Sequence, residues 1–199
     1  MVRPTIKELQ WQVREDVIID AAHELFGEQG YAEMSMDDLA ARVGISKATL
    51  YQHFQSKEEV AIHVIVGLKQ RGNAILESIS PDLPAISGIE TWLRSGLAQR
   101  IDARTRGMDL MPLSVKAHPL YREVDERIFA HASALIERAK AEGDVAPALA
   151  APIAARMLMR LFSGDFKDYF RDDQITGTDV AETLIAIVLN GLRVRSRNI

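Results

Sequence analysis

Residues 35–54 read SMDDLAARVGISKATLYQHF, and this stretch decides the fold. A capping-box pattern begins at Ser35 and predicts the start of a short helix. Gly44 predicts the end of that helix, and Ser46 is the N-cap candidate of the next one. The sequence therefore predicts two short helices joined by a tight turn, which is the arrangement of a helix-turn-helix. Such a turn is common between helices, so the turn alone is weak evidence for DNA binding.

Helical periodicity continues on both sides of this stretch. Apolar residues recur at the spacing of one helix face over 17–26, and Gly30 is a stop signal. Ser56 begins a second capping box and a long helix, expected to run to about Ile79. Further helices are expected over roughly 86–105, 119–141, 148–171 and 178–194. The sequence predicts an all-α fold of about nine helices, an N-terminal three-helix helix-turn-helix domain plus a larger C-terminal helical bundle.

Composition narrows the class of protein. The 199 residues include no cysteine, which excludes a disulfide framework, a cysteine-based zinc site and a thiol nucleophile. Apolar residues make up 47% and charged residues 26%, proportions typical of a folded chain. No secretory signal pattern stands at the N-terminus, and the longest apolar run, 184–189, is far shorter than the about 20 residues of a membrane span. We expect a soluble, cytoplasmic protein that does not contact the membrane.

The charge distribution bears on nucleic-acid binding. The net charge of −4 by itself argues against it, because DNA-binding domains usually carry a basic excess. Residues 1–60 are the acidic part, with 6 Lys and Arg against 11 Asp and Glu. Between Leu39 and Lys57, however, the chain carries Arg42, Lys47 and Lys57 and no acid. This local excess favours DNA binding that depends on shape and hydrogen bonds more than on bulk charge.

The residues around the turn also carry a family resemblance. Residues 43–58 read VGISKATLYQHFQSKE. This run resembles the N-terminal domain of the TetR family of bacterial transcriptional regulators, whose typical run is Gly-Val-Ser-x-Gly-Thr-Leu-Tyr-x-His-Phe-x-Ser-Lys-Glu. The resemblance covers about residues 14–60 and becomes faint beyond them. The chain departs from the family pattern at Ala48, where the family has glycine, so the base sequence that it reads is expected to differ.

The resemblance implies which residues meet DNA. Lys47 and Ala48 lie where the family reaches base edges, and they suit guanine O6 and N7 and the thymine methyl group respectively. Thr49, Tyr51 and His53 fall where the family hydrogen-bonds phosphates. The full set of candidate DNA-binding residues is Ser35, Arg42, Lys47, Ala48, Thr49, Tyr51, Gln52, His53 and Lys57.

The remaining members of that set have their own expected roles. Gln52 is expected at a phosphate or at an adenine edge. Lys57 lies in the first turn of the long helix, whose N-terminus points at a phosphate in the family. Ser35 and the start of its helix are expected to hold a second phosphate in the same way. Asp37 would repel a phosphate, so we expect it to support the helix dipole and to face away from the duplex. Leu50 is expected in the core, together with Phe54.

For the rest of the chain the resemblance implies a second role. Residues 1–57 are expected to form the helix-turn-helix DNA-binding domain, and 58–199 an effector-binding and dimerisation domain that pairs through its last two helices. The candidate residues of an effector pocket are Trp92, Met108, Met111, Tyr121, Phe129, Met157 and Phe162. Simple core packing explains each of them equally well. No metal site and no cofactor is predicted.

The sequence thus predicts a homodimeric transcriptional regulator. We interpret it as a repressor that a small-molecule effector of unknown identity releases from palindromic, double-stranded operator DNA. The nucleophile elbow, the phosphate-binding glycine loop and the His-Glu-x-x-His motif are absent, so the sequence indicates no enzyme. The alternative is a helical small-molecule-binding protein or enzyme with a vestigial DNA-binding domain. Sequence-dependent binding to the DNA upstream of its own gene would separate the two.

Overall fold

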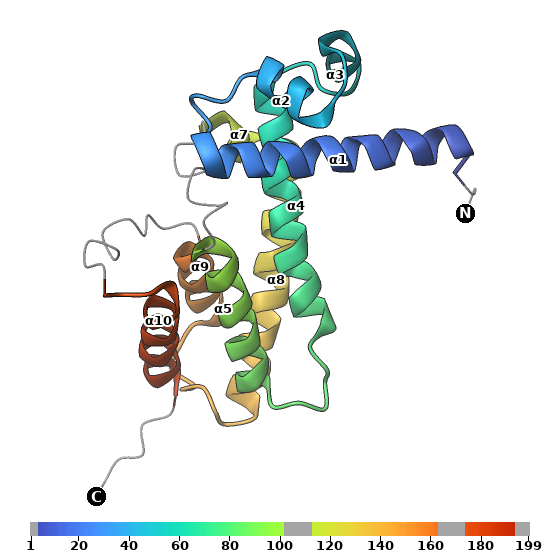
Figure 1. Cartoon of the computed structure of the whole chain (residues 1–199). Helices are drawn as coiled ribbons and strands as arrows, with labels where there is room; N and C mark the ends of the chain where they lie inside the picture. Colours follow the sequence, from blue (N-terminus) through green and yellow to red (C-terminus); the bar gives the residue numbers. More distant parts are fainter. Residues whose placement is uncertain (1–3, 102–112, 163–173, 194–199) are drawn as a thin grey trace, which may run out of the picture. The chain divides into compact units, whose positions relative to one another are not determined.

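The structure is a computed structural model that describes residues 4–101, 113–162 and 174–193. Within these ranges the chain forms nine helices and no strand, apart from one isolated bridge between Val145 and Arg193. In chain order the helices are α1 (Ile6–Gln29), α2 (Met36–Val43), α3 (Lys47–His53), α4 (Lys57–Ser78), α5 (Ala85–Ile101), α7 (Leu113–Ala117), α8 (Pro119–Ala141), α9 (Ala151–Leu161) and α10 (Gly177–Leu192) (Figure 1). The predicted all-α class is confirmed. No helix in the described ranges is long and apolar enough to cross a membrane.

The described residues fall into two compact units. The first unit contains 4–68 and 113–122, and the second contains 69–101, 123–162 and 174–193. The first turns of α4 belong to the first unit because Val60, Ala61 and Val64 are buried in its core. The predicted boundary between a DNA-binding domain, 1–57, and an effector-binding and dimerisation domain, 58–199, concerns function and stays a prediction.

Local hydrogen bonds set the short helices of the first unit. The Ser35 hydroxyl caps α2 by accepting from the backbone N–H of Asp38, and the Asp38 carboxylate accepts from the backbone N–H of Ser35 in return. The turn after α2 passes through Gly44 in the left-handed conformation, with φ of 74°, which glycine adopts without steric cost. Ser46 then caps α3 by accepting from the N–H of Thr49. The predicted helix-turn-helix is therefore formed.

The core of the first unit joins its helices through apolar side chains. Leu50 and Phe54 are 0% and 2% exposed, which confirms their prediction as core residues. They belong to a cluster that also holds Ile18, Leu25, Phe26, Leu39, Val60 and Val115. Packing against α1 and α4 therefore fixes one face of α3 and leaves the opposite face for solvent.

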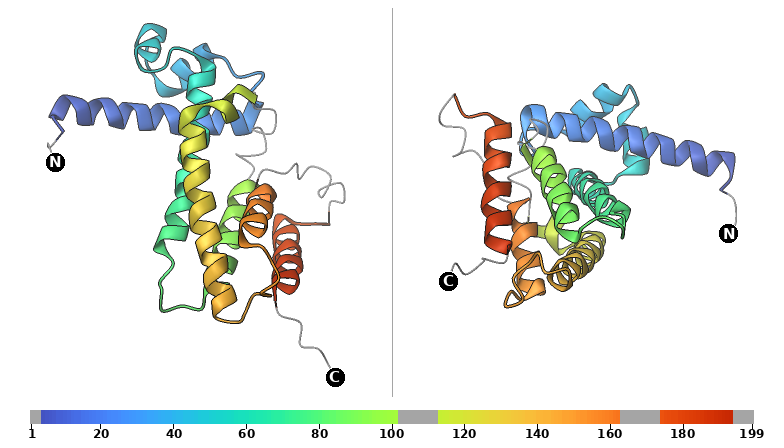
Figure 2. Two further views of the ribbon diagram at one scale, coloured as in Figure 1. Left: turned by 180° about the vertical axis from the view of Figure 1, so that it is seen from behind. Right: turned by 90° about the horizontal axis from the view of Figure 1, so that it is seen from below.

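The second unit has a core of its own, built from α5 and from the helices that follow. Its most buried large side chains include Ile89, Leu93 and Leu97 of α5 and Ile136 of α8. Helix α5 packs against α10, and both views in Figure 2 keep these green and red helices together. At Gly96 the backbone comes so close to Phe162 that a Cβ there would lie 2.5 Å from the ring.

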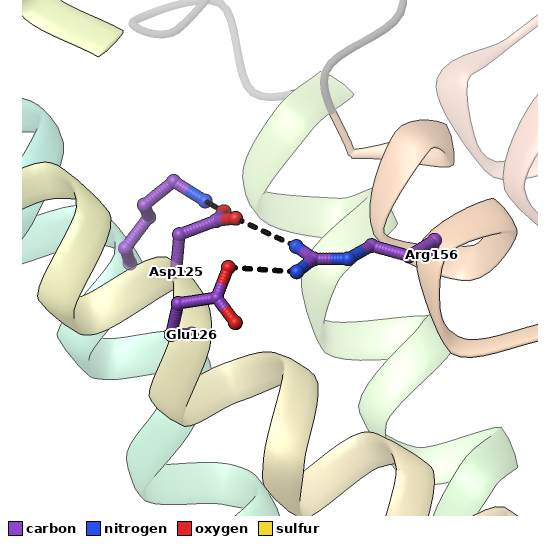
Figure 3. Close-up of polar contacts among 4 residues, drawn as sticks. Asp125, Glu126 and Arg156 are labelled. Atoms are coloured by element: carbon purple, nitrogen blue, oxygen red, sulfur yellow. Dashed lines mark hydrogen bonds and ion pairs between the residues drawn. The ribbon is translucent and has the colours of Figure 1, made fainter. Parts of the chain in front are cut away.

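A charged cluster ties α4, α8 and α9 together in the second unit (Figure 3). The carboxylate of Asp125 on α8 accepts from Lys69 of α4 at 2.6 Å and from Arg156 of α9 at 3.1 Å. Arg156 also donates to Glu126 at 2.7 Å, which raises the pKa of the guanidinium. Its guanidinium lies 3.8 Å from the centroid of the Phe129 ring, a cation–π distance. One arginine thus connects two carboxylates and an aromatic ring.

Candidate nucleic-acid interface

Helix α3 has one buried and one exposed face. Leu50 and His53 are 0% and 8% exposed and point into the first unit. The exposed face, at positions that share one side of a helix, consists of Lys47, Ala48, Tyr51 and Gln52. Four of the predicted DNA-binding side chains therefore come together on one accessible surface, where a major groove could receive them.

Lys47, the first residue of α3, is paired with an acid of α2. Its Nζ lies 2.7 Å from Oδ1 and 3.0 Å from Oδ2 of Asp37. The hydrogen bond to Asp37 raises the pKa of the Lys47 ammonium. The expectation that Asp37 faces away is therefore corrected, since its carboxylate meets Lys47 at the start of α3. The reason is that the tight turn brings the first turn of α2 beside that of α3.

Arg42 on α2 is also paired, with two acids of α1. Its guanidinium donates to Glu28 at 2.6 and 3.1 Å and lies 3.6 Å from Glu24. The hydrogen bond from Arg42 lowers the pKa of Glu28. The local positive charge predicted between residues 39 and 57 is thus offset by acids from elsewhere in the sequence. Folding places those acids beside the cations, and a count restricted to residues 39–57 does not include them.

Lys57, the first residue of α4, is held by the segment between α1 and α2. Its Nζ donates to the carbonyl oxygens of Tyr31, Ala32 and Met34 at 2.9, 3.0 and 3.0 Å. It also lies 4.7 Å from the centroid of the Tyr31 ring. An ammonium group has three N–H donors, so these carbonyls occupy all of them. The role of Lys57 as a phosphate ligand stays a prediction, and a phosphate there would compete with the three carbonyls.

His53 lies on the side of α3 away from the exposed face. A side chain that contacts a phosphate, as expected of His53, would lie on an accessible side. Its side chain is 0% exposed, and its Nδ1 is 3.5 Å from Oε1 of Glu15. The ring lies 3.8 Å from the ring of Trp11, whose indole N–H donates to the same Glu15 at 2.7 Å. Its Nε2 is buried and has no hydrogen-bond partner among the described residues. In this structure the His53 side chain braces α3 against α1.

Trp11 and Glu15 were not singled out by the sequence reasoning. They lie one helical turn apart on α1, so the sequence could have indicated only their contact with each other, as an i,i+4 pair. Their partner His53 is 38 residues from Glu15 in the sequence, a separation that no local pattern bridges.

The Ser35 and Thr49 hydroxyl groups of the predicted set have partners at the starts of α2 and α3. The Ser35 hydroxyl donates to Asp38 at 2.6 Å, and the Thr49 hydroxyl lies 2.8 Å from that of Ser46. Thr49 is half-buried and Ser35 is exposed. Their phosphate contacts stay predictions, and a phosphate would compete with the present partner of each hydroxyl.

The predicted effector residues gather only in part. Trp92 and Phe162 meet edge to face in the second unit, with ring centroids 5.0 Å apart. Phe129 and Met157 line an open groove together with Pro152, Ile153, Arg156 and Arg160. Tyr121 packs against the core of the first unit. Met108 and Met111 lie outside the described residues, so a single effector pocket stays a prediction. No group of three potential metal ligands occurs in the described part of the chain.

Two capped helices around a tight left-handed turn, with an exposed polar face on the second, define a helix-turn-helix protein of the DNA-binding class. The family described as bacterial regulatory proteins, tetR family, matches residues 18–64. Residues 18–64 therefore form a DNA-binding domain of this family, as the sequence predicts.

Relatives and solved structures agree with this assignment. The HTH-type transcriptional regulator EthR of Mycolicibacterium smegmatis is 30% identical over 145 residues, 68% of this chain and 66% of EthR. The chain thus spans just under two thirds of the length of that relative. The fatty acid degradation regulator FadR from Bacillus halodurans has a similar fold, with a TM-score of 0.75 and 20% identity over 98% of this chain and 100% of FadR. AibR, solved with isovaleryl coenzyme A and operator DNA, has a TM-score of 0.62 and 16% identity over 87% of this chain and 97% of AibR.

Proposed function

We propose that this protein is a transcriptional repressor that binds a palindromic operator as a homodimer and leaves it when a small-molecule effector binds. One observation carries the proposal, namely that the exposed face of α3 presents Lys47, Ala48, Tyr51 and Gln52 on a helix whose other face is buried. The similarity to EthR, a transcriptional regulator, supports the same role. The operator DNA is cytoplasmic, and so is the protein.

The last two helices supply the surface for a second copy. Ile153 and Met157 of α9 are 65% and 66% exposed, and Ile187 of α10 is 64% exposed. Covering large apolar side chains with a partner removes them from water and thereby stabilises the complex. A two-fold dimer would present two copies of α3 to half-sites one helical turn of DNA apart, and this matches a palindromic operator.

The second unit is the place for the effector. AibR, a protein of the same fold, was solved with an acyl coenzyme A and with operator DNA. An effector weakens operator binding only by its differential affinity for the two states of the protein. The aromatic pair Trp92 and Phe162 is the described candidate for contacting it, because Ile153 and Met157 of the open groove are assigned to the dimer surface.

The test is binding to the DNA immediately upstream of the protein's own gene. We expect a sequence-dependent complex with wild-type protein at low and at moderate salt. Lys47→Ala should lose the preference for one base pair in each half-site, because Lys47 is the cation of the exposed face of α3. Lys116→Ala removes an exposed lysine of α7 and serves as the control. The absence of any sequence-dependent complex would overturn the proposal and favour a helical ligand-binding protein or enzyme instead.

A further inference from the structure

We propose that Asp37 is a specificity-determining residue, which holds Lys47 in the free protein and thereby weakens binding to random DNA more than binding to the operator. The inference rests on the proposed function and adds a residue of α2 to the reading surface of α3.

The geometry of the pair supports this role. Both carboxylate oxygens of Asp37 lie within 3.0 Å of the Lys47 Nζ. The two side chains remain 65% and 57% exposed, so DNA that approaches α3 can reach both. Asp37 is also not needed to cap α2, because Asp38 and Ser35 form the capping box. The described contacts of the Asp37 carboxylate are therefore those with Lys47.

DNA that binds Lys47 must replace Asp37. A backbone phosphate binds the ammonium but leaves the Asp37 carboxylate unpaired beside another negative charge. An unpaired charge of this kind disfavours the complex with the wrong DNA. A guanine edge offers two acceptors, O6 and N7, in fixed positions within the groove. The exchange is therefore less unfavourable at a guanine that Lys47 reaches than at an arbitrary phosphate. Asp37 consequently penalises the complex in which Lys47 contacts only the DNA backbone.

The experiment compares two duplexes of equal length, the fragment upstream of the gene and one of random sequence. Asp37→Asn keeps the size of the side chain and removes its charge. We expect this variant to bind random DNA about five- to tenfold more tightly and the upstream fragment at most about twofold more tightly. In a Lys47→Met background the same substitution should change both affinities by the same factor, because the difference between the duplexes depends on the ammonium.

A matched control separates this effect from general charge repulsion. Asp20→Asn removes one exposed negative charge from α1 of the same unit. Equal gains from Asp20→Asn and Asp37→Asn on both duplexes would overturn the inference, because bulk charge would then explain them. A larger gain on random DNA than on the upstream fragment that persists without Lys47 would also overturn it. Failure of the wild-type protein to distinguish the duplexes would overturn the proposed function itself, a separate result. Thermal unfolding checks that each variant remains folded.

Discussion

The two units of this protein differ in how their structure relates to the chain. In the first unit, α2 and α3 are each defined by a serine cap, and the turn between them is formed by one glycine. In the second unit, α5 packs on α10, and Asp125 gathers a lysine of α4 and an arginine of α9. Local signals therefore shape α2, α3 and the turn between them, whereas contacts between distant segments shape the second unit.

The units also use charge differently. In the first unit the pair Lys47–Asp37 lies on the exposed surface where DNA is expected, so a ligand can exchange it. In the second unit the side chains of Lys69 and Asp125 are each only 23% exposed and connect helices. The Lys47–Asp37 pair is therefore open to exchange by a ligand, while the more buried Lys69–Asp125 pair holds α4 and α8 together.

The largest expected effect separates the stability of the two units. Phe54→Ala removes a side chain that is 2% exposed in the core of the first unit. We expect a loss of about 3–5 kcal/mol in the free energy of unfolding, because the truncation leaves a cavity. Amide hydrogen exchange should show lost protection in α1 to α3 and retained protection in α5, α9 and α10. Equal loss in both units would mean that they unfold as one, and Phe54→Leu is the mild control.

The next effect concerns close packing in the second unit. A Cβ at Gly96 would lie 2.5 Å from the Phe162 ring, so Gly96→Ala should destabilise by about 1–3 kcal/mol through overpacking. Gly72 in α4 has no atom within 4 Å of such a Cβ, so Gly72→Ala should stabilise by about 0.5–1 kcal/mol through reduced backbone freedom in the unfolded chain. Chemical denaturation measures both changes. The two substitutions should change the free energy of unfolding in opposite directions. A loss of stability at both positions would contradict the open space beside Gly72 in α4.

A smaller effect tests what Lys57 contributes to the first unit. Lys57→Gln retains at most part of the bonding to the three carbonyls, so we expect a loss of about 1–2 kcal/mol in stability. Because its N–H donors are occupied, the slope of log affinity against log salt on DNA should stay unchanged. A slope shallower by about 1 per protomer would instead assign Lys57 to a phosphate. Measured affinities at four salt concentrations decide between these outcomes.

The smallest expected effect comes from removing the N-cap of α2. Ser35→Ala should lower the melting temperature by about 2–4 °C at neutral pH, because it removes a capping hydroxyl. The hydrogen bonds from Ser35 lower the pKa of Asp38 below its ordinary value of 3.8. A carboxyl with a lowered pKa stabilises the folded state above its ordinary pKa, and this contribution is lost as the pH falls through the folded value. The difference between variant and wild type should therefore shrink below about pH 4. A difference that is constant with pH would contradict the reciprocal cap.

Much of the helix-turn-helix and of the exposed face of α3 could be predicted from the sequence. The caps at Ser35 and Ser46 and the turn at Gly44 are local signals, and they define α2 and α3 without any distant contact. Helical spacing also predicts that Leu50 and Phe54 are buried, and the position of Lys47 on the exposed face follows from the same periodicity. These features depend on residues only a few positions apart.

The partners of the three cations around the turn were decided by tertiary structure alone. Lys47 meets an acid 10 residues away, Arg42 one that is 14 residues away, and Lys57 a carbonyl 26 residues away. His53 turns inward toward Glu15 because α1 packs behind α3, and no local pattern contains that contact. The chain by itself determined a helix-turn-helix and its exposed face, since backbone hydrogen bonds and caps act over a few residues. Only the folded arrangement decided which cations already hold acceptors, since an ion pair depends on distance in space and not on distance in sequence.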